Sequence, residues 1–340
     1  MQVMTVTGPI SAGEMGITLP HEHILLDYDW EGLWPDVSQR PDLVWEPVSI
    51  TNLGVIRRNY MAVRDNANFE DIEEMSQDVS YFAAAGGGTI CEMTTLGLRP
   101  NPVGLRKISQ RTGVHIVAGT GFYTQVTLSR AQASMDLEAM RAMMVRDLTE
   151  GFAGTDVKAG VIGEVALSHP MGEIEERSLR AAARAHKETG AAICVHGISP
   201  EAVQVLQEEG VDPTRVVACH QDGTNPERAK PMADLGIYIE FDCFGHEFYC
   251  DNGAMDGPWP FKFSSDRERV TGLVRMIEAG YADRLLLSQD VCVKMQLRQY
   301  GAFGYAHVLE NIVPMLLRAG VTREQIDMML VHNPARVFAY

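Results

Sequence analysis

Two histidines separated by one residue, His21 and His23, give the strongest indication of chemistry in this chain. They lie in the segment Leu19-Pro20-His21-Glu22-His23, near the end of a strand-like run. On a β-strand, residues i and i+2 point to the same face, so two imidazoles with this spacing can bind one metal ion. The same spacing occurs in histidines that are only packed or solvated. The pair therefore predicts a metal site only if other ligands converge on it.

Four more side chains of metal-binding type lie in later apolar runs or just after them: Glu164, His196, His220 and Asp290. Each has an ordinary alternative. Glu164 could be an ion-pair partner, the two histidines could be core residues bonded to backbone, and Asp290 could cap a helix. However, an acid inside an apolar run is costly unless it is paired or bound to a metal. The recurrence of these residue types at the ends of successive runs favours one shared metal site.

Four histidines, one aspartate and one glutamate are too many ligands for one tetrahedral zinc ion. We therefore expect two adjacent divalent ions. The first would bind His21, His23 and Asp290. The second would bind His196 and His220, and Glu164 would bridge the two. Such a pair can hold a shared hydroxide and polarise the bond that is cut, and Asp290 could move the proton to the leaving group. Zinc is the first expectation, with manganese, iron and cobalt as alternatives.

Short apolar or β-branched runs alternate with longer stretches of helical periodicity. The eight predicted strands are Gly16–His23, Thr89–Met93, His115–Thr120, Val161–Ala166, Ala192–His196, Val216–His220, Ile237–Phe241 and Leu285–Gln289. The predicted helices include Asp136–Phe152, Ile174–Thr189, Pro200–Glu209, Asp266–Ala279 and Tyr305–Ala319. Eight units of this kind predict an α/β fold of the (β/α)8 TIM-barrel type, in which function lies at the C-terminal ends of the strands.

A doubly wound open sheet is the rival fold. It would carry Gly-x-Gly-x-x-Gly after its first strand, whereas the run Gly86-Gly87-Gly88 precedes a strand and is typical of a turn. We predict one domain over residues 1–340, with a short N-terminal β-hairpin in the first 15 residues beneath the barrel floor. The stretch 27–47, rich in Trp, Pro and Asp, is expected to be an ordered loop near the site.

The composition narrows the range of partners and compartments. A net charge of −16 argues against binding nucleic acid or an anionic membrane surface, and a small-molecule substrate is expected instead. No apolar run approaches the ~18 residues of a membrane span, and no secretory signal is visible. The six cysteines are scattered without a Cys-x-x-Cys motif, which favours a cytoplasmic location over a disulfide framework. A homodimer is a further expectation for a barrel of this kind.

The whole pattern resembles the phosphotriesterase-like branch of the amidohydrolase superfamily. The matching segments are Leu19–His23, Lys158–Glu164, Ala181–Gly190, Val195-His196, Cys219-His220 and Ser288–Asp290. The resemblance covers almost the whole chain. It implies a (β/α)8 barrel, a binuclear metal centre and hydrolysis of esters, lactones, amides or phosphoesters.

Two departures from that pattern bear on the function. Many members bridge the metals with a carbamylated lysine, but Gly163 stands at that position here and the acid follows at Glu164. One residue reverses the facing of a side chain on a regular strand, so Glu164 can reach the metals only through a bulge or local twist. The glutamate arrangement is similar to that of the phosphotriesterase-homology subgroup. Cys243 stands where lactonases of this family typically have arginine, which argues against an acyl-homoserine lactonase.

The segments 242–247 and 300–307 resemble phosphotriesterase-related, or resiniferatoxin-binding-like, proteins. This subgroup implies an N-acyl amide hydrolase for a small N-acyl amino acid or sulfonate. A phosphoester or organophosphate hydrolase is the first alternative, because the same hydroxide can attack phosphorus. A non-catalytic small-molecule binding barrel is the second alternative. The full set of ligands argues against that second alternative.

Other residues after the predicted strands are candidates for substrate contact. The phenol of Tyr123 could donate to a developing oxyanion, although packing at the barrel mouth explains it equally well. Arg99 could clamp a carboxylate or sulfonate, and a solvated loop arginine is its alternative. The remaining substrate-binding candidates are Trp30, His246, Glu247, Lys294 and Arg298.

Overall fold

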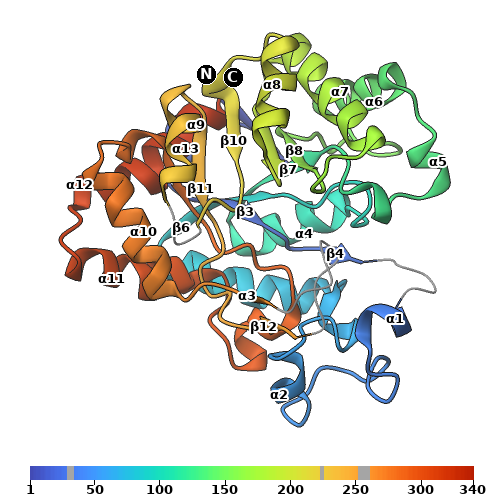
Figure 1. The fold of residues 1–340 in the computed structure, drawn as a ribbon, viewed down its shortest axis with the longest axis vertical. Coiled ribbons are helices and arrows are strands. Elements are labelled where there is room, and N and C mark those ends of the chain that lie inside the picture. The colour runs from blue at the N-terminus through green and yellow to red at the C-terminus, as the bar shows by residue number, and fades with distance from the viewer. Residues whose placement is uncertain (29–33, 223–225, 252–260) are drawn as a thin grey trace.

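The computed structural model describes residues 1–28, 34–222, 226–251 and 261–340 (Figure 1). Trp30, one of the predicted substrate-contact residues, lies outside this part of the chain. Among the described residues, no helix has the length and apolarity of a membrane span.

Eight parallel strands form one sheet, in the order β14-β11-β10-β9-β8-β7-β6-β3. Their bounds are β3 Ile17–Glu22, β6 Gly87–Glu92, β7 His115–Thr120, β8 Val161–Ala166, β9 Ile193–His196, β10 Val216–Ala218, β11 Tyr238–Phe241 and β14 Leu285–Leu287. The two outer strands meet just beyond their ends, where the backbone N–H of Asp290 donates to the carbonyl of His21 over 3.1 Å and that of His23 to Val291 over 3.3 Å. The predicted (β/α)8 barrel is confirmed.

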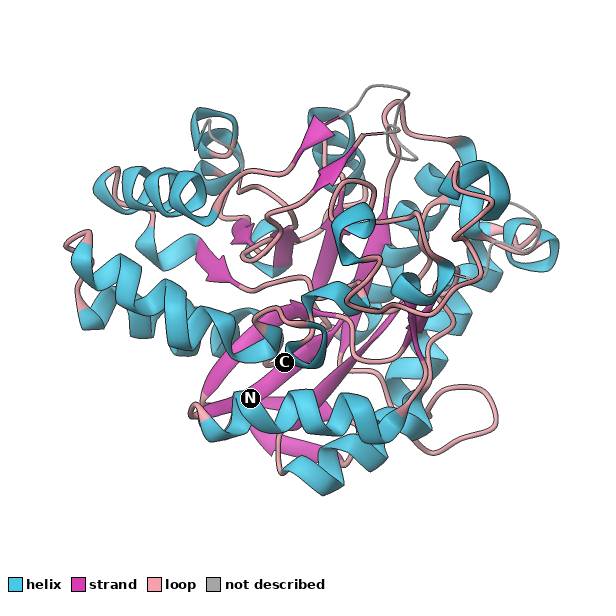
Figure 2. Ribbon diagram, turned by 90° about the horizontal axis from the view of Figure 1, so that it is seen from below, coloured by secondary structure: helices cyan, strands magenta, loops and turns pink. Residues whose placement is uncertain are grey.

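Helices surround the strands on the outside of the barrel (Figure 2). Their bounds are α1 Trp34–Ser38, α2 Leu53–Ile56, α3 Ile72–Ala84, α4 Pro102–Thr112, α5 Arg130–Ala133, α6 Leu137–Thr149, α7 Glu173–Thr189, α8 Pro200–Glu208, α9 Lys230–Asp234, α10 Asp266–Glu278, α11 Val313–Arg318, α12 Arg323–Asp327 and α13 Asn333–Phe338. The predicted helix Tyr305–Ala319 is less regular than expected. It begins as a 3₁₀ turn at Gly304–Ala306 and continues as a π-helical stretch at Val308–Ile312 before α11. Pro314 has no N–H to donate to the preceding turn, which accounts for the irregular backbone hydrogen bonding of the helix at this point.

The predicted N-terminal hairpin is confirmed as β1 Gln2–Thr5 paired antiparallel with β2 Gly8–Ser11. Val3 is buried in one cluster with Met15, Val117 and Phe338, which closes the N-terminal end of the barrel. Gln2 and Tyr340 exchange two backbone hydrogen bonds of 3.3 and 2.9 Å, so the two ends of the chain lie together (Figure 1).

Loops that follow β3, β11 and β14 pack together over the C-terminal end of the barrel and form what we call the cap. The first loop carries α1 and α2, and the second pairs β12 Tyr249–Cys250 with β13 Phe261–Lys262. A separate hydrophobic cluster joins all three loops, comprising Val48, Ile56, Ala62, Val63, Phe248, Val293 and Met295. α1 and α2 lie beside β12 at the bottom of Figure 1. Residues 34–47 of the predicted ordered loop 27–47 are part of this cap, and residues 29–33 of that prediction lie outside the described residues.

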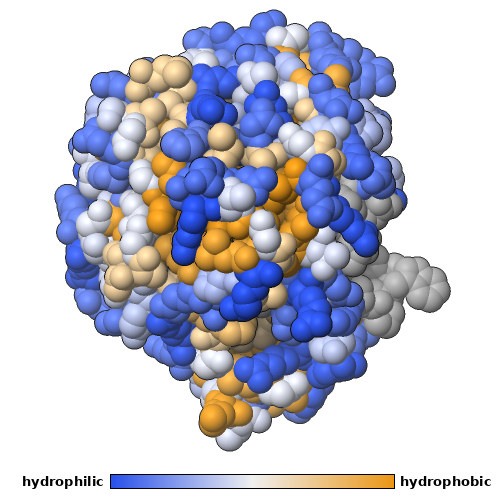
Figure 3. All heavy atoms as spheres, turned by 90° about the vertical axis from the view of Figure 1, so that its left-hand side faces the viewer, coloured by the Kyte–Doolittle hydropathy of each residue, from blue (hydrophilic) through white to orange (hydrophobic). Residues whose placement is uncertain are grey.

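Hydrophobic residues also gather on part of the outer surface. Figure 3 shows one side of the molecule, where a hydrophobic patch is surrounded by hydrophilic residues. Contiguous apolar surface of this kind is where copies of a chain can associate. The homodimer stays a prediction.

Candidate metal centre

The six predicted metal ligands come together at the C-terminal end of the barrel. The carboxylate of Glu164, on β8, lies among four imidazoles. Its oxygens lie 3.5 Å from His21 Nε2, 3.4 Å from His23 Nε2, 3.1 Å from His196 Nδ1 and 3.6 Å from His220 Nε2. Asp290, after β14, faces the same point, with Oδ1 3.4 Å from His23 Nε2 and 4.0 Å from His21 Nε2.

An irregularity in β8 directs Glu164 to this point. The register with β9 shifts between Ile162 and Val165, which is a local irregularity at the place where the sequence required a bulge or local twist. Gly163 has a φ of +140°, and a Cβ on it would lie 2.7 Å from the carbonyl oxygen of Cys194. Glycine at this position therefore lets β8 approach β9 while the following side chain turns towards the histidines.

Two of the candidate ligands have backbone conformations that are uncommon for residues other than glycine. The φ angles of His220 and Asp290 are +56° and +48°. The backbone N–H of His220 donates to the carboxylate of Asp242 over 3.0 Å, and that of Asp290 donates to the carbonyl of His21. Non-glycine residues in this region tend to cluster at functional sites, where the surroundings hold them in place.

Outer carboxylates that the sequence analysis did not assign orient the histidine rings. Glu240 Oε2 lies 2.9 Å from His21 Nδ1, and Asp242 Oδ1 lies 3.0 Å from His220 Nδ1. The Nδ1–H that each ring donates to its carboxylate fixes the direction of the ring, so that Nε2 faces Glu164. An acid within an apolar strand was the signal for Glu164, and the run Ile239-Glu240-Phe241 contains the same signal.

A similar series of hydrogen bonds orients His23. Its Nδ1 lies 2.9 Å from the hydroxyl of Thr94, which donates to Glu92 over 2.5 Å. Tyr305 donates its hydroxyl to the backbone carbonyl of His23 over 2.6 Å. The ring and the backbone of this candidate ligand are thus both fixed before any ion binds.

The charges in the cluster stabilise one another. Burial alone would raise the pKa of Glu164, but the imidazole of His196 and hydrogen bonds from the other histidines hold that pKa well below its usual range. Burial opposes protonation of His23, yet Asp290 and Glu164 raise its pKa to about 9. Burial likewise acts against ionisation of Asp290, and the hydrogen bond with His23 lowers its pKa. At neutral pH Glu164 and Asp290 are therefore ionised, and His23 holds a proton that an ion can displace.

The residues present fit a metal centre. Nε2 of His21 is buried and makes no hydrogen bond within the described part of the chain, so this nitrogen is open to a cation that displaces its proton. Donor atoms of His21, His23 and Asp290 lie within 4.8 Å of one another, as do those of His21, Glu164 and His220. Imidazole with carboxylate is a donor set that suits zinc, manganese, iron and cobalt.

Tyr123 lies next to this cluster. Its ring is 7% exposed and meets the ring of His196 edge-on, with centroids 5.5 Å apart. Burial raises the pKa of its phenol well above the usual value, and the nearby carboxylate of Glu164 adds to the shift. The hydroxyl therefore keeps its proton at neutral pH and is available as a donor.

His246 contacts the backbone of Asp290. Its Nε2 donates to the backbone carbonyl of Asp290 over 2.7 Å and lies 3.8 Å from the carboxylate oxygen Oδ2. The ring packs against Phe248 and Phe263, and burial lowers its pKa. A neutral His246 thus links the backbone of a candidate ligand to the cap.

The structure places the other four described substrate candidates in different contacts. Glu247 is exposed and accepts from the backbone N–H of Asp266 over 2.8 Å. Lys294 pairs with Asp65 over 2.6 Å, and Arg99 with Asp27 over 2.9 Å. Arg298 pairs with Glu310 and lies over the ring of Tyr81. None of these partners is one of the six candidate metal ligands.

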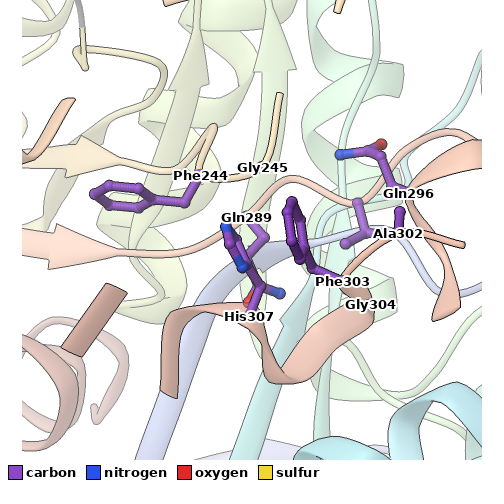
Figure 4. Close-up of a pocket in the computed structure, with 9 residues that line it drawn as sticks. Phe244, Gly245, Gln289, Gln296, Ala302, Phe303, Gly304 and His307 are labelled. Atoms are coloured by element: carbon purple, nitrogen blue, oxygen red, sulfur yellow. The ribbon is translucent and has the colours of Figure 1, made fainter. Parts of the chain in front are cut away.

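A small cavity lies between the loops that follow β11 and β14, beside the candidate centre (Figure 4). Its lining includes Phe244, Gln289 and Gln296, and the stacked rings of Phe303 and His307, whose centroids are 4.1 Å apart. The six candidate ligands are not among the described residues that line it. The cavity is therefore distinct from the cluster, although Gln289 and Val291 of its lining adjoin Asp290 in the sequence.

A (β/α)8 barrel whose strand ends bring together histidines and carboxylates in this way defines a metal-dependent hydrolase. The chain belongs to the phosphotriesterase family, whose model matches residues 1–338. It is 36% identical to the N-acetyltaurine hydrolase of Xenopus tropicalis over 98% of this chain and 96% of that protein. It is 37% identical to a phosphotriesterase-related protein of Nematostella vectensis over 97% and 96%. The solved resiniferatoxin-binding protein from Rhodobacter sphaeroides matches with a TM-score of 0.92 and 34% identity, over 99% of this chain and 95% of that one.

Proposed function

We propose that this chain is a binuclear metal-dependent hydrolase that cleaves the amide bond of a small N-acyl amino sulfonate or N-acyl amino acid. The observation that carries the proposal is the carboxylate of Glu164 within 3.6 Å of ring nitrogens from four histidines. The likeness to an N-acetyltaurine hydrolase over nearly the full length supports the choice of an N-acyl amino sulfonate.

The charge of the buried site supports two ions. Six carboxyl side chains are buried at the C-terminal ends of the strands: Glu22, Glu92, Glu164, Glu240, Asp242 and Asp290. Within the described part of the chain, none of them forms an ion pair with lysine or arginine. Burial raises the pKa of Glu22, Glu92 and Glu240, whereas contacts with histidines outweigh burial and lower the pKa of Glu164, Asp242 and Asp290. Buried ionised carboxylates need nearby positive charge, and divalent ions would supply it to these last three in place of the histidine protons.

One ion would be held by His21, His23 and Asp290, and the other by His196 and His220. The carboxylate of Glu164 would hold both ions. Bound ions of this kind polarise a carbonyl and lower the pKa of a water molecule. Asp290 would accept the proton of the attacking water and return it to the amide nitrogen as the C–N bond breaks, so that the products are a carboxylate and an amine. Tyr123 would donate its phenolic proton in a hydrogen bond to the developing oxyanion.

The first test is the metal content of the purified protein. We expect close to two ions per chain in wild type and fewer in Glu164→Ala, because the bridging carboxylate is lost. Asp156→Asn is the matched control, since Asp156 is an exposed acid paired with Arg106 at the surface. Fewer than two ions in wild type after metal is added back would contradict the binuclear centre, and no bound ion would favour a binding barrel.

The second test is a panel of substrates for the metal-loaded protein. N-acetyltaurine, N-acyl amino acids, lactones and phosphotriesters differ in the bond that is broken but share attack by an activated water. We expect the highest kcat/KM for the N-acyl amino sulfonates. If a phosphotriester or lactone is the preferred substrate, the proposed amide substrate is wrong and the same metal centre hydrolyses phosphoesters or lactones instead.

A further inference from the structure

Asp242 contacts histidines from both halves of the proposed metal pair. It follows β11 and is fully buried. Oδ1 lies 3.0 Å from Nδ1 of His220, and Oδ2 lies 3.4 Å from Nδ1 of His21. In the proposed centre, His21 binds one ion and His220 binds the other. A single carboxylate therefore faces the outer nitrogen of one ligand of each ion.

Other outer groups contact only one of the candidate ligands. Glu240 approaches the ring of His21, and Thr94 approaches the ring of His23. Cys243 Sγ lies 3.7 Å from Nδ1 of His220. Apart from the six candidate ligands, Asp242 is the one described residue whose side chain contacts ring nitrogens of both His21 and His220.

Asp242 also fixes the backbone of His220. Both of its oxygens accept the backbone N–H of that residue, at 3.1 and 3.0 Å, where the φ angle is +56°. A carboxylate that accepts from Nδ1–H sets the tautomer and the orientation of the ring, which directs the Nε2 lone pair at the metal position. Asp242 thus fixes the ring and the backbone of His220 by hydrogen bonds, and its second oxygen faces Nδ1 of His21 at 3.4 Å, beside the hydrogen bond of that nitrogen with Glu240.

We propose that Asp242 is a positioning residue that couples the two ion positions, so that its loss weakens the binding of both ions together. This inference rests on the binuclear centre of the proposed function. Glu240 provides the matched comparison, because it lies in β11, two residues before Asp242, is equally buried and approaches His21 but none of the other five candidate ligands.

The test compares ion retention in metal-loaded wild type, Asp242→Asn and Glu240→Gln during dialysis against increasing concentrations of a chelator. An asparagine at 242 offers one acceptor oxygen and places an N–H₂ group beside the second imidazole. We expect both ions to be lost from Asp242→Asn at about 10- to 100-fold lower chelator concentration than from wild type. Glu240→Gln should lose one ion early and keep the other as wild type does.

A spectroscopic measurement separates positioning from a general loss of structure. In the zinc-loaded, ¹⁵N-histidine-labelled protein, Nδ1–H signals of His21 and His220 report their hydrogen bonds directly. Asp242→Asn should shift both signals, and Glu240→Gln should shift that of His21 alone. If Asp242→Asn does not fold, wild type still decides, because the absence of a protected Nδ1–H on His220, the ring that Asp242 accepts from, overturns the proposal.

Failure of the inference is distinct from failure of the function. Wild type that retains fewer than two ions would overturn the binuclear centre itself. Wild type with two ions, together with an Asp242→Asn protein that loses one ion and keeps the other at wild-type affinity, would overturn the coupling role alone. An Asp242→Asn protein that leaves the His21 signal unmoved would do the same.

Discussion

At the scale of single residues, Asp290 has the contacts of a group that moves a proton at the candidate centre. One oxygen faces His23 and His21, and the other faces His246. Its φ of +48° is one that asparagine also tolerates, so Asp290→Asn should fold. We expect kcat to fall by about 10²- to 10⁴-fold with little change in thermal stability, because general-base catalysis is removed. Steady-state kinetics on the best substrate of the panel checks this.

The control for Asp290→Asn is its metal content. If the ions remain and kcat is unchanged, the proton goes elsewhere and the assignment of Asp290 is wrong. If the ions are lost, the kinetic result reports metal binding, and the measurement must be repeated at saturating metal.

Tyr123→Phe tests the second residue proposed to act on the reacting carbonyl. The ring and its edge-on contact with His196 are kept, so only the hydroxyl is removed. We expect kcat to fall by about 10²- to 10³-fold, as for the loss of one oxyanion donor, while metal content and the melting temperature stay close to wild type. An unchanged kcat would leave Tyr123 as a packing residue.

At the scale of elements, the irregular segment of β8 decides where Glu164 points. Gly163→Ala would place a Cβ 2.7 Å from the backbone of β9 at a φ of +140°. We expect a loss of about 1–3 kcal/mol in the free energy of unfolding from the backbone conformation alone, and a fall in metal content as Glu164 moves. Denaturant unfolding and metal analysis measure the two effects.

Gly280→Ala is the matched control for the Gly163→Ala variant. Gly280 has a φ of +95°, and a Cβ added to it would meet no described atom within 4 Å. It should show the conformational cost without loss of metal. Equal metal loss in both variants would mean that β8 has no special part in directing Glu164.

At the scale of the whole molecule, the buried charges make the metal-free protein sensitive to pH. The pKa of His23 is raised from 6.5 to about 9, so its contribution to stability is complete below about pH 6.5 and is lost as pH rises through about 9. Burial also raises the pKa of Glu240 from 4.5 to about 7. The contribution of this group to the stability of the folded protein is therefore also lost as pH rises through about 7. Both groups act in the same direction.

We therefore expect the melting temperature of the metal-free protein to fall between about pH 6 and about pH 9. Bound ions replace the proton on His23, and their affinity rises with pH, so the gap between metal-loaded and metal-free protein should widen over this range. Thermal melts with and without chelator measure both curves. A melting temperature that stays level or rises in the metal-free protein would contradict this picture.

The sequence was sufficient for the barrel and for the convergence of the candidate ligands. Each strand of a parallel barrel can be predicted from a short apolar run in the sequence. The C-terminal ends of all the strands then lie at the same end of the barrel. Six residues at those ends were thus brought together by topology alone, whatever the details of the loops. The need for a bulge or local twist at Glu164 also followed from counting strand positions, and the register of β8 shifts at this place.

Only the tertiary structure decided the partners of the charged loop residues. Lys294 pairs with Asp65, which is 229 residues away, and Arg99 pairs with Asp27 across 72 residues. The same holds for the contact of Asp242 with His21. No local pattern encodes such pairs, because they depend on how loops from different strands pack at the barrel mouth. Strand alternation is a local property of the sequence, whereas the partner of a long charged side chain is set by contacts that form only when the whole barrel closes.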